Sequence, residues 1–341
     1  MRLKTTGERA ILEAGQGGYR EYRIPGILAA PDGALLLVCE ARAENKGDWG
    51  DIDILALRLE KDGSLRRVLK VGESAQPQHP VPSMRTYHNP VLIPDGKKIH
   101  LIYHRNYERA FLLSSADGGS SWGESREITA AYREFPYDWN VCATGPGHGL
   151  QMRNGQLIAP VWLAHGEERD GGLSRAHWPS TAGWIYSQDH GRTWHPGQLA
   201  AGVLNANETS AVQLAGGALL LNFRNMNENR RRVLGLSENG RTLRRLWSPD
   251  ELRDPMCFGG MAAGMGGVLF ANCDSCEKRQ DITVKYSPDG GESWAPLWQI
   301  DQQGGYVDIA CAAGRVYAFY ERYSYTKGIV EALVLKTGEE G

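Results

Sequence analysis

An eight-residue pattern, S-x-D-x-G-x-x-W, occurs three times along the 341-residue chain. The three copies are Ser115-Ala-Asp117-Gly-Gly119-Ser-Ser-Trp122, Ser187-Gln-Asp189-His-Gly191-Arg-Thr-Trp194 and Ser287-Pro-Asp289-Gly-Gly291-Glu-Ser-Trp294. In such a stretch the Asp and Ser side chains hydrogen-bond the backbone of a turn, and Gly supplies a positive φ. Each copy therefore predicts a hairpin turn that its tryptophan packs down, with a structural role away from any active site.

The spacing of these turns predicts the architecture. Two weaker copies occur at Lys61-Asp62-Gly63 and at Ser237-Glu-Asn239-Gly240-Arg-Thr. The Asp or Asn of the five copies stands at positions 62, 117, 189, 239 and 289, so the unit is about 50 residues long, with one wider interval. That is the length of one four-stranded propeller blade. Five turns, plus a blade closed by the two chain ends, predict an all-β, six-bladed β-propeller of four-stranded antiparallel blades. We expect it to form a single domain over residues 1–341.

Strand-like runs flank the turns, and no segment keeps the 3.6-residue apolar period of a helix. The runs that lead into turns are residues 111–115, 183–187, 233–237 and 282–287. The runs that we expect to form inner strands of the blades are residues 34–40, 98–104, 156–162, 218–224 and 315–321.

Composition narrows the class of protein. The chain has 42 Gly, 16 Pro, 10 Trp and 14 Tyr, which is typical of many short strands joined by tight turns. Its 38 Lys and Arg nearly balance 40 Asp and Glu, and a net charge of −2 argues against a nucleic-acid partner. No run approaches the roughly 20 apolar residues of a membrane span, and no apolar segment follows Arg2 and Lys4 as in a signal peptide. We expect a cytoplasmic location for the sequence as it stands, or secretion if a leader has been trimmed from it.

The six cysteines are too few for a disulfide scaffold in a chain of this length. Cys273 and Cys276 form a C-x-x-C, a pattern found in half zinc sites and in redox pairs. A second C-x-x-C, a paired His and a surrounding βαβ pattern are all missing from the sequence. We therefore expect reduced thiols near a strand-end turn, and the sequence predicts neither a metal nor a cofactor.

Further motifs occur in a fixed order from about residue 19 to residue 321. They are Tyr22-Arg23-Ile24-Pro25, Glu40-Ala-Arg42, Gly47-Asp48, Gly50-Asp51-Ile52-Asp53, Thr144-Gly-Pro-Gly-His148-Gly, Asn222-Phe-Arg224-Asn225, Gly305-Tyr306-Val-Asp308 and Tyr320-Glu321. Together with the octapeptides, which look like Asp boxes, they resemble the exo-α-sialidase (neuraminidase) family of bacteria and animals. The ordered set covers nearly the whole chain and is far more specific than any one motif.

The resemblance implies three arginines that hold the carboxylate of a sialic acid: Arg23, Arg224 and Arg279. Arginine suits that task because its planar guanidinium is always charged and pairs with a carboxylate through two hydrogen bonds. Four other arginines compete with Arg279 for the third position: Arg230, Arg231, Arg232 and Arg253.

The resemblance also implies a tyrosine nucleophile. A sialic acid carries its carboxylate on the anomeric carbon, so a carboxylate nucleophile would be repelled, and sialidases use tyrosine instead. Tyrosine has an unperturbed pKa of about 10 and needs a base beside it. Tyr306 matches the nucleophile and Glu208, 16 residues before Arg224, matches its partner. The alternatives are a core aromatic for Tyr306 and a loop carboxylate for Glu208.

The leaving-group oxygen needs a proton donor that later deprotonates water. Asp48 matches this acid/base in the resemblance, with Asp51 and Asp53 as competitors. Because Asp51 and Asp53 share one face of a predicted strand, a structural role suits them better. The resemblance places Arg42 at the ring hydroxyls of the substrate, and gives Glu321 the supporting role of holding Arg23 by an ion pair.

Three features depart from the family pattern or extend it. The segment Asp254-Pro-Met-Cys257-Phe-Gly-Gly is a variant form, and Val307 stands where many members carry Ser. The loop of residues 165–179, bounded by Trp162 and Trp184, is long and accounts for the wide interval between turns. We expect it to border the leaving-group side of the site. His148 is expected to be structural.

The resemblance implies an exo-α-sialidase that hydrolyses terminal α-linked sialic acid with retention, its partners being sialylated glycans. The alternatives are a hydrolase or trans-glycosidase for another nonulosonic acid, such as the deaminated sugar, and a non-catalytic sialic-acid-binding propeller. The latter would be expected to lack Tyr306, Glu208 or Asp48. A propeller scaffold for protein partners gives no reason for the motifs to occur together. Linkage preference, the choice between hydrolysis and transfer, and the oligomeric state are left open by the sequence.

Overall fold

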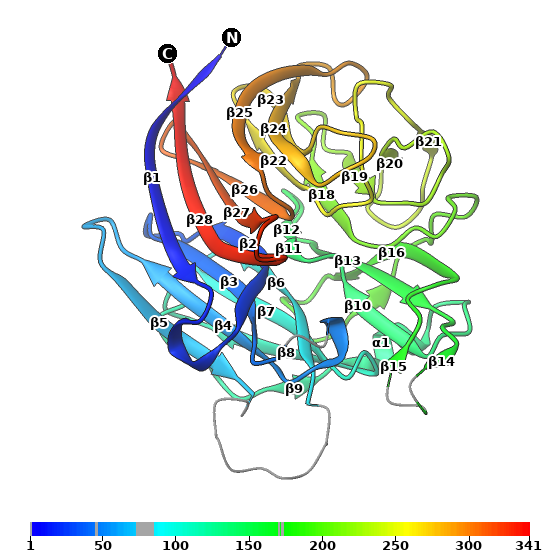
Figure 1. Ribbon diagram of the computed structural model, residues 1–341. Helices are drawn as coiled ribbons and strands as arrows, with labels where there is room; N and C mark the ends of the chain where they lie inside the picture. Colours follow the sequence, from blue (N-terminus) through cyan, green and yellow to red (C-terminus); the bar gives the residue numbers. More distant parts are fainter. Residues whose placement is uncertain (1, 45–46, 73–84, 170, 172–173) are drawn as a thin grey trace.

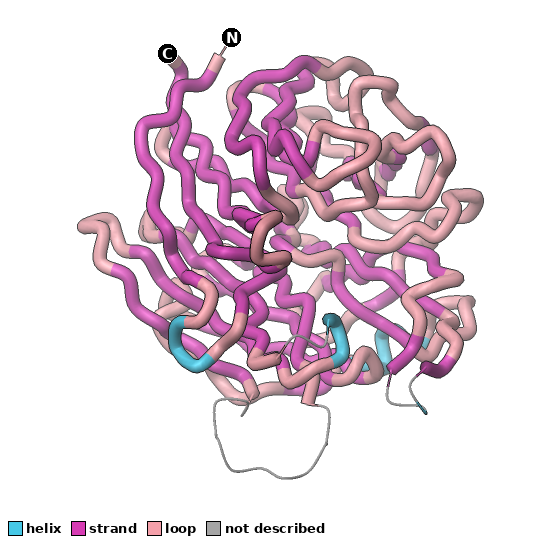
Figure 2. The backbone as a smooth tube through the Cα atoms, in the orientation of Figure 1, coloured by secondary structure: helices cyan, strands magenta, loops and turns pink. Residues whose placement is uncertain are grey.

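Six antiparallel sheets follow one another along the chain in the computed structural model, which describes residues 2–44, 47–72, 85–169, 171 and 174–341. Figure 1 shows the sheets arranged around a common centre. Five of them use strands that are consecutive in sequence, whereas the sixth joins the first strand of the chain to the last three. The prediction of an all-β, six-bladed propeller closed by both chain ends is confirmed. Figure 2 shows how little of the backbone is helical.

Each sheet contains four principal strands. The closing sheet has the order β1 (Leu3–Glu13), β28 (Ile329–Glu340), β27 (Arg315–Ser324), β26 (Val307–Ala312). The next two are β2 (Glu21–Ala29), β3 (Leu35–Arg42), β4 (Ile52–Leu59), β5 (Leu65–Val71), and β6 (Tyr87–Asp95), β7 (Lys98–Arg105), β8 (Arg109–Ser115), β9 (Arg126–Glu127). The last three are β10 (Val141–Thr144), β13 (Leu157–Ala164), β16 (Ser180–Ser187), β17 (His195–Pro196); β18 (Thr209–Gln213), β19 (Leu219–Phe223), β20 (Val233–Ser237), β21 (Arg245–Trp247); and β22 (Gly260–Gly264), β23 (Gly267–Cys273), β24 (Gln280–Ser287), β25 (Ala295–Gln303).

The remaining elements are short. The 5-residue helix α1 (Thr129–Arg133) is too brief to show a helical period in the sequence. Two 3₁₀ turns, η1 (Gln16–Gly18) and η2 (Gly47–Trp49), and four two-residue strands complete the described part of the chain. Those strands are β11 (Gly147–His148), which pairs parallel to β6, β12 (Leu150–Gln151), which pairs with β13, and the hairpin of β14 (Glu168–Arg169) with β15 (Ser174–Arg175). The wide interval between turns therefore holds α1, β11 and β12 as well as the loop of residues 165–179.

The three octapeptide turns join the third and fourth strands of their sheets and are built identically. In each, the serine hydroxyl donates to the aspartate at 2.8 Å, as from Ser187 to Asp189, and accepts the amide of the glycine that follows, as from Gly191 at 2.9 Å. The same aspartate accepts the amide and hydroxyl of the residue before the tryptophan, Thr193 in this copy. Gly191 has a φ of 76°, which a residue with a side chain adopts only at a cost. The predicted turns are confirmed.

One prediction about the sheets was wrong. The runs predicted as inner strands form β3, β7, β13, β19 and β27, which are the second strands of their sheets. The strands that contact one another around the centre are instead β2, β6, β18, β22 and β26, with β10 beside β6. Second strands lie between two neighbours and bury nearly every residue, as β19 does, so they give the strongest apolar runs. The inner strands contain more Gly, Ser and Thr, so their sequences indicate a strand less clearly.

Candidate functional site

The residues predicted to form the site come together at one face of the propeller. In an antiparallel blade the start of the first strand, the end of the second and the start of the third meet at the same face. The predicted residues stand at those ends: Arg23 in β2, Glu208 before β18 and Tyr306 before β26; Arg42 at the end of β3 and Arg224 after β19; Arg279 before β24. The third octapeptide turn begins at Ser287, the other end of β24, roughly 25 Å away.

Tyr306 lies at the centre of the group and is 5% exposed. Its hydroxyl donates to Glu208, with both carboxylate oxygens at 2.7 Å, and accepts a hydrogen bond from Nη1 of Arg224 at 2.7 Å. Arg224 also forms an ion pair with Glu208. Burial raises the pKa of the Tyr306 phenol, and the Glu208 charge raises it further, whereas Arg224 and Arg279 act in the opposite direction. A phenol in contact with a carboxylate and a guanidinium can lose its proton to the one while the other stabilises the phenolate.

Two more guanidinium groups face the ring of Tyr306. The Cζ of Arg23 lies 5.3 Å from the ring centroid and that of Arg279 lies 5.2 Å from it. Three arginines therefore converge on one tyrosine. Burial alone would lower the pKa of Arg23, but the neighbouring Glu321, Tyr306 and Asp48 together outweigh it and raise that pKa well above the usual value. The guanidinium is therefore cationic at neutral pH.

The arginines that competed with Arg279 have other side-chain partners, although Arg232 also donates to the Glu208 carbonyl at 3.5 Å. Arg232 is fully buried and bonds the Asn222 side chain and the carbonyl of Cys257. Arg253 pairs with Asp274 at 2.8 Å. Arg231 donates to the sulfur of Cys276 at 3.0 Å, and Arg230 is exposed.

Glu321 joins the two ends of the chain beneath the site. It accepts Nε and Nη2 of Arg23 at 3.0 and 3.2 Å, the amide of Ile24 at 3.0 Å and the amide of Tyr306 at 3.1 Å. Ile24 has a φ of 58°, a strained value for a β-branched residue, and a bulge separates Arg23 from Gly26 in β2. The carboxylate thus orients Arg23 through the expected ion pair. Its contact with the Tyr306 amide, which was not expected, also fixes the backbone of the nucleophile candidate.

Asp48 lies in η2 with its side chain 45% exposed, and Nη2 of Arg42 donates to it at 2.9 Å. Arg42 is itself held by Glu40, through Nη2 at 2.6 Å and Nε at 3.0 Å. Although partial burial acts in the opposite direction, the Arg42 charge holds the pKa of Asp48 well below its usual range, helped by His177 and Arg23. Asp48 is therefore ionised at neutral pH when the site is empty.

The other two aspartates of this region have structural contacts. Asp53 is fully buried, accepts the hydroxyl of Tyr19 at 2.6 Å and pairs with Lys70 at 3.2 Å. Asp51 precedes β4, and its carbonyl accepts the amide of Ala43. His148, expected to be structural, bonds Asp308, which also accepts the amide of Ile27.

An aromatic cluster beside Asp48 was not predicted from the sequence. The ring of His177 lies 5.9 Å from Trp49, 4.7 Å from Tyr107 and 5.2 Å from Trp162, measured between centroids. Nε2 of His177 is buried and has no hydrogen-bond partner. Burial lowers the pKa of His177, while Asp48 and Glu208 act against that. These residues come from four separate loops and strands, so no spacing in the sequence could have joined them.

A cavity of about 500 Å³ opens beside the site. The predicted site residues that line it are Arg23, Arg42, Asp48, Arg279 and Glu321, whereas Tyr306, Glu208 and Arg224 are not among its lining residues. No described residue of the loop 165–179 lines it; residues 170 and 172–173 of that loop lie outside the described part. His177 nevertheless brings the loop against Trp49, next to Asp48. The loop's predicted place on the leaving-group side stays a prediction.

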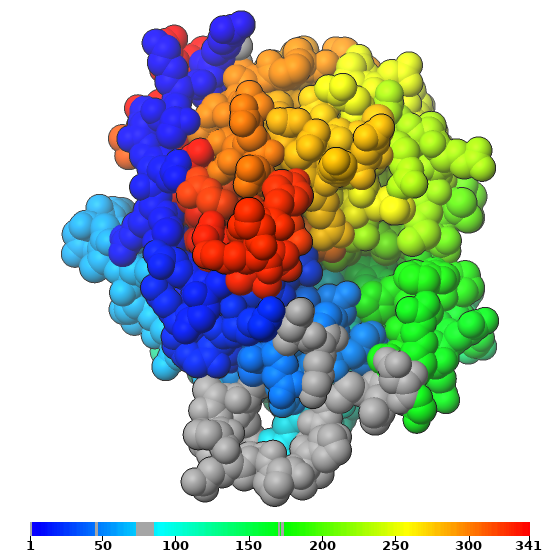
Figure 3. Space-filling model, in the orientation of Figure 1, coloured from blue at the N-terminus to red at the C-terminus, as the bar shows by residue number. Residues whose placement is uncertain are grey.

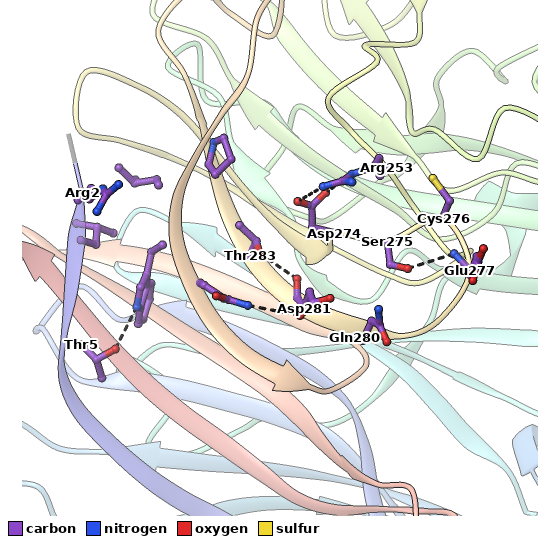
Figure 4. A pocket seen from close by; sticks show the side chains of 15 residues that line it. Arg2, Thr5, Arg253, Asp274, Ser275, Cys276, Glu277, Gln280, Asp281 and Thr283 are labelled. Carbon is purple, nitrogen blue, oxygen red and sulfur yellow. Dashed lines mark hydrogen bonds and ion pairs between the residues drawn. The ribbon is translucent and has the colours of Figure 1, made fainter.

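A larger cavity of about 920 Å³ lies between the N-terminal strand and β24–β25 (Figure 4). Several of its polar groups are paired with one another: Arg253 with Asp274, and the Gln299 amide with Asp281. It contains none of the predicted site residues.

Within the described ranges, no group of three or more His, Cys, Asp or Glu is placed to hold a metal ion, and the cysteines are all free thiols. No helix of the described part is long and apolar enough to cross a membrane.

Comparison with known proteins fits this geometry. A family model described as a BNR repeat-like domain matches residues 37–332. The sialidase of Micromonospora viridifaciens is 26% identical over 335 residues, which cover 87% of this chain and 48% of that protein. The solved structure of the Hadza microbial sialidase Hz136 superimposes with a TM-score of 0.76 at 24% identity, covering 97% of this chain and 68% of that one. Trypanosoma rangeli sialidase with 2,3-difluorosialic acid, a covalent intermediate, gives 0.74 at 16% identity over 97% and 59%.

At these identities the two solved structures show the fold alone. The chain spans about half the length of the curated relatives it matches, 48% for the Micromonospora viridifaciens protein. The family model, in contrast, matches most of the chain, and the curated relatives are sialidases. The chain therefore belongs to the BNR repeat-like, exo-α-sialidase family.

Proposed function

We propose that residues 1–341 form a single catalytic domain, an exo-α-sialidase that hydrolyses terminal α-linked sialic acid with retention of configuration. The observation that carries this proposal is the contact of one buried tyrosine hydroxyl with both a carboxylate and a guanidinium. Two further guanidinium groups stand against the same ring. A core tyrosine or a protein-binding scaffold has no need of three converging cations.

Substrate binding is assigned to the arginines. The C1 carboxylate of the sugar pairs with Arg23, Arg224 and Arg279, which are always charged and present planar donors. Glu321 keeps Arg23 in its orientation, so little freedom is lost on binding. Arg42, next to Asp48 at the cavity wall, faces the ring hydroxyls.

The first chemical step forms a glycosyl–tyrosine bond. The Tyr306 oxygen attacks the anomeric carbon, and its proton passes to Glu208, which already accepts that hydroxyl. The bond to the leaving oxygen breaks, and Asp48 gives that oxygen a proton. In the second step water attacks the same carbon and its proton passes to Asp48. The bond from that carbon to the Tyr306 oxygen breaks, and Glu208 returns a proton to this oxygen. Two inversions give overall retention.

The electrostatics explain how an ionised Asp48 becomes an acid. Arg42 and Arg23 lower its pKa in the empty site. A bound sugar carboxylate neutralises positive charge next to Asp48 and thereby raises that pKa. Proton donation is thus promoted by the substrate itself.

The test is hydrolysis of a methylumbelliferyl α-sialoside and its deaminated analogue, with proton NMR of the first sugar anomer released. We expect release from one of them and the α anomer first. A 2,3-difluoro sialic acid should add one sugar mass to the Tyr306 peptide, because fluoride leaves readily and the fluorine at C3 slows breakdown. Absence of release from both sugars contradicts the enzyme; a label on another residue contradicts only the role of Tyr306.

A further inference from the structure

The site cavity extends beyond the groups that the proposed reaction uses. Besides Asp48 and Arg279, its wall includes residues of the β27–β28 hairpin and the β23–β24 loop: Lys278, Tyr323, Tyr325, Ile329 and Val330. In Figure 3 the C-terminal hairpin, in red, stands out in the middle of this face. The cavity is therefore longer than the carboxylate-binding part alone requires.

Tyr325 presents a fixed aromatic surface at this end. The residue is 51% exposed, one of three large hydrophobic residues that are exposed in the described part. Its hydroxyl donates to the carbonyl of Arg279 at 2.8 Å, and its ring packs edge-on against Tyr323 at 5.0 Å. A tyrosine held at both ends loses little freedom when a ligand packs on it.

The position of Asp48 indicates what fills this space. In the proposed reaction the leaving-group oxygen lies within hydrogen-bond reach of Asp48. The sugar rings on the far side of that oxygen must then lie beside Asp48 but outside the arginines. The hairpin residues line the same cavity as Asp48 and take no part in binding the carboxylate, so we assign this space to the leaving sugar. The C–H face of a pyranose packs well on the face of an aromatic ring, and Lys278 can donate to its hydroxyls.

We propose that Tyr325 determines leaving-group specificity by holding the first sugar of the leaving glycan against its ring. This inference rests on the proposed function and deepens it. It also places the leaving group at the hairpin rather than at the loop of residues 165–179.

Trp178 provides a matched comparison from that loop. It is 45% exposed, close to the value for Tyr325, yet it does not line the cavity. The guanidinium of Arg169 covers its ring at 4.8 Å. Two aromatic residues of similar exposure on different loops thus differ in whether the cavity reaches them.

The experiment compares kcat/KM for sialyllactose, whose leaving group is a disaccharide, with methyl α-sialoside, whose leaving group has no ring. We expect Tyr325→Ala to lower the value for sialyllactose about fivefold to tenfold and to leave methyl α-sialoside within about twofold. Tyr325→Phe, which keeps the ring, should stay near wild type with both substrates. Trp178→Ala should leave the ratio between the two substrates unchanged.

Other outcomes overturn the inference. An equal loss with both substrates would show that Tyr325 only supports Arg279, and unchanged kinetics would show that the ring is not used. A loss of kcat/KM for sialyllactose alone, seen only in Trp178→Ala, would indicate that the leaving group binds at the loop of residues 165–179. If wild type hydrolyses neither substrate, the proposed function fails first. Saturation-transfer NMR with lactose then still tests the subsite. A lactose signal that disappears in Tyr325→Ala and persists in Trp178→Ala supports it, whereas no signal with wild type contradicts it.

Discussion

The two faces of the propeller are built in different ways. On the turn face, each octapeptide satisfies its own polar groups within a few residues, and the same hydrogen bonds recur three times. On the site face, the contacts join residues far apart in sequence: 298 positions from Arg23 to Glu321 and 98 from Tyr306 to Glu208. The contacts of the turn face are local in sequence and occur three times, whereas those of the site face join distant residues and occur once. Loss of one turn should weaken the protein slightly, while loss of one site residue should remove a function.

Tyr306→Phe gives the largest expected effect and tests the contacts of the site face. The variant keeps the ring against Arg23 and Arg279 but removes the hydroxyl that Glu208 accepts. We expect kcat for a natural sialoside to fall by about 10³-fold, with the urea midpoint shifted little because Arg224 and Glu208 still pair. Steady-state kinetics and urea unfolding measure the two. A large loss of stability with activity retained would contradict both assignments.

Glu321→Gln should affect function and stability together. Glu321 is 1% exposed and is the partner of the part-buried Arg23. Removing its charge leaves a cation unpaired, which costs about 3 kcal/mol of unfolding free energy, and should raise KM about tenfold or more while kcat falls less. Denaturant unfolding and KM for methylumbelliferyl α-sialoside check this. A neutral result would mean that Arg23 is held by the fold without Glu321.

Ser187→Ala tests the repeated contacts of the turn face. The buried hydroxyl accepts the Gly191 amide and donates to Asp189, so its loss should lower the unfolding free energy by about 1–2 kcal/mol. Activity per folded molecule should be unchanged. Ser115→Ala and Ser287→Ala serve as matched controls, with equal costs that add in the triple variant. Unequal costs would show that the three turns are not energetically equivalent.

The pH dependence of the second turn gives the smallest effect. Although slight burial acts the other way, hydrogen bonds from Thr193 and Ser187 lower the pKa of Asp189 to about 2. The unfolded value is about 3.9, so this group stabilises the folded state above pH 4 and the contribution is lost as the pH falls toward 2. Because the carboxylate is close to solvent, we expect about 1 kcal/mol. Asp189→Asn should be less stable by that amount at pH 6, with the difference narrowing toward pH 2.

The same contrast explains how much the sequence could predict. The octapeptides allowed the number of blades and the positions of the third strands to be predicted, because each forms its turn through hydrogen bonds within the motif. The run at residues 233–237 coincides with β20. The inner strands were misplaced because their residues pack against other blades, and apolar content alone favours the second strands.

Site prediction followed a similar division. Motifs bring Tyr306, Glu208, Arg224, Arg279 and Arg23 together as the resemblance implies. The neighbours that lack a motif were missed. His177 lies beside Asp48 because its ring packs against Trp49, and Tyr325 meets Arg279 at a backbone carbonyl. Contacts of this kind arise from the closed ring and leave no pattern in the sequence.

The closing sheet has a consequence for folding. Arg23 in β2 meets Tyr306 and Glu321 of the closing sheet, and that sheet joins β1 to β28, which lie at opposite ends of the described residues. A folding intermediate that lacks this sheet therefore holds no complete site, however well its other blades have folded. Any property that depends on the complete site thus reports closure of the ring.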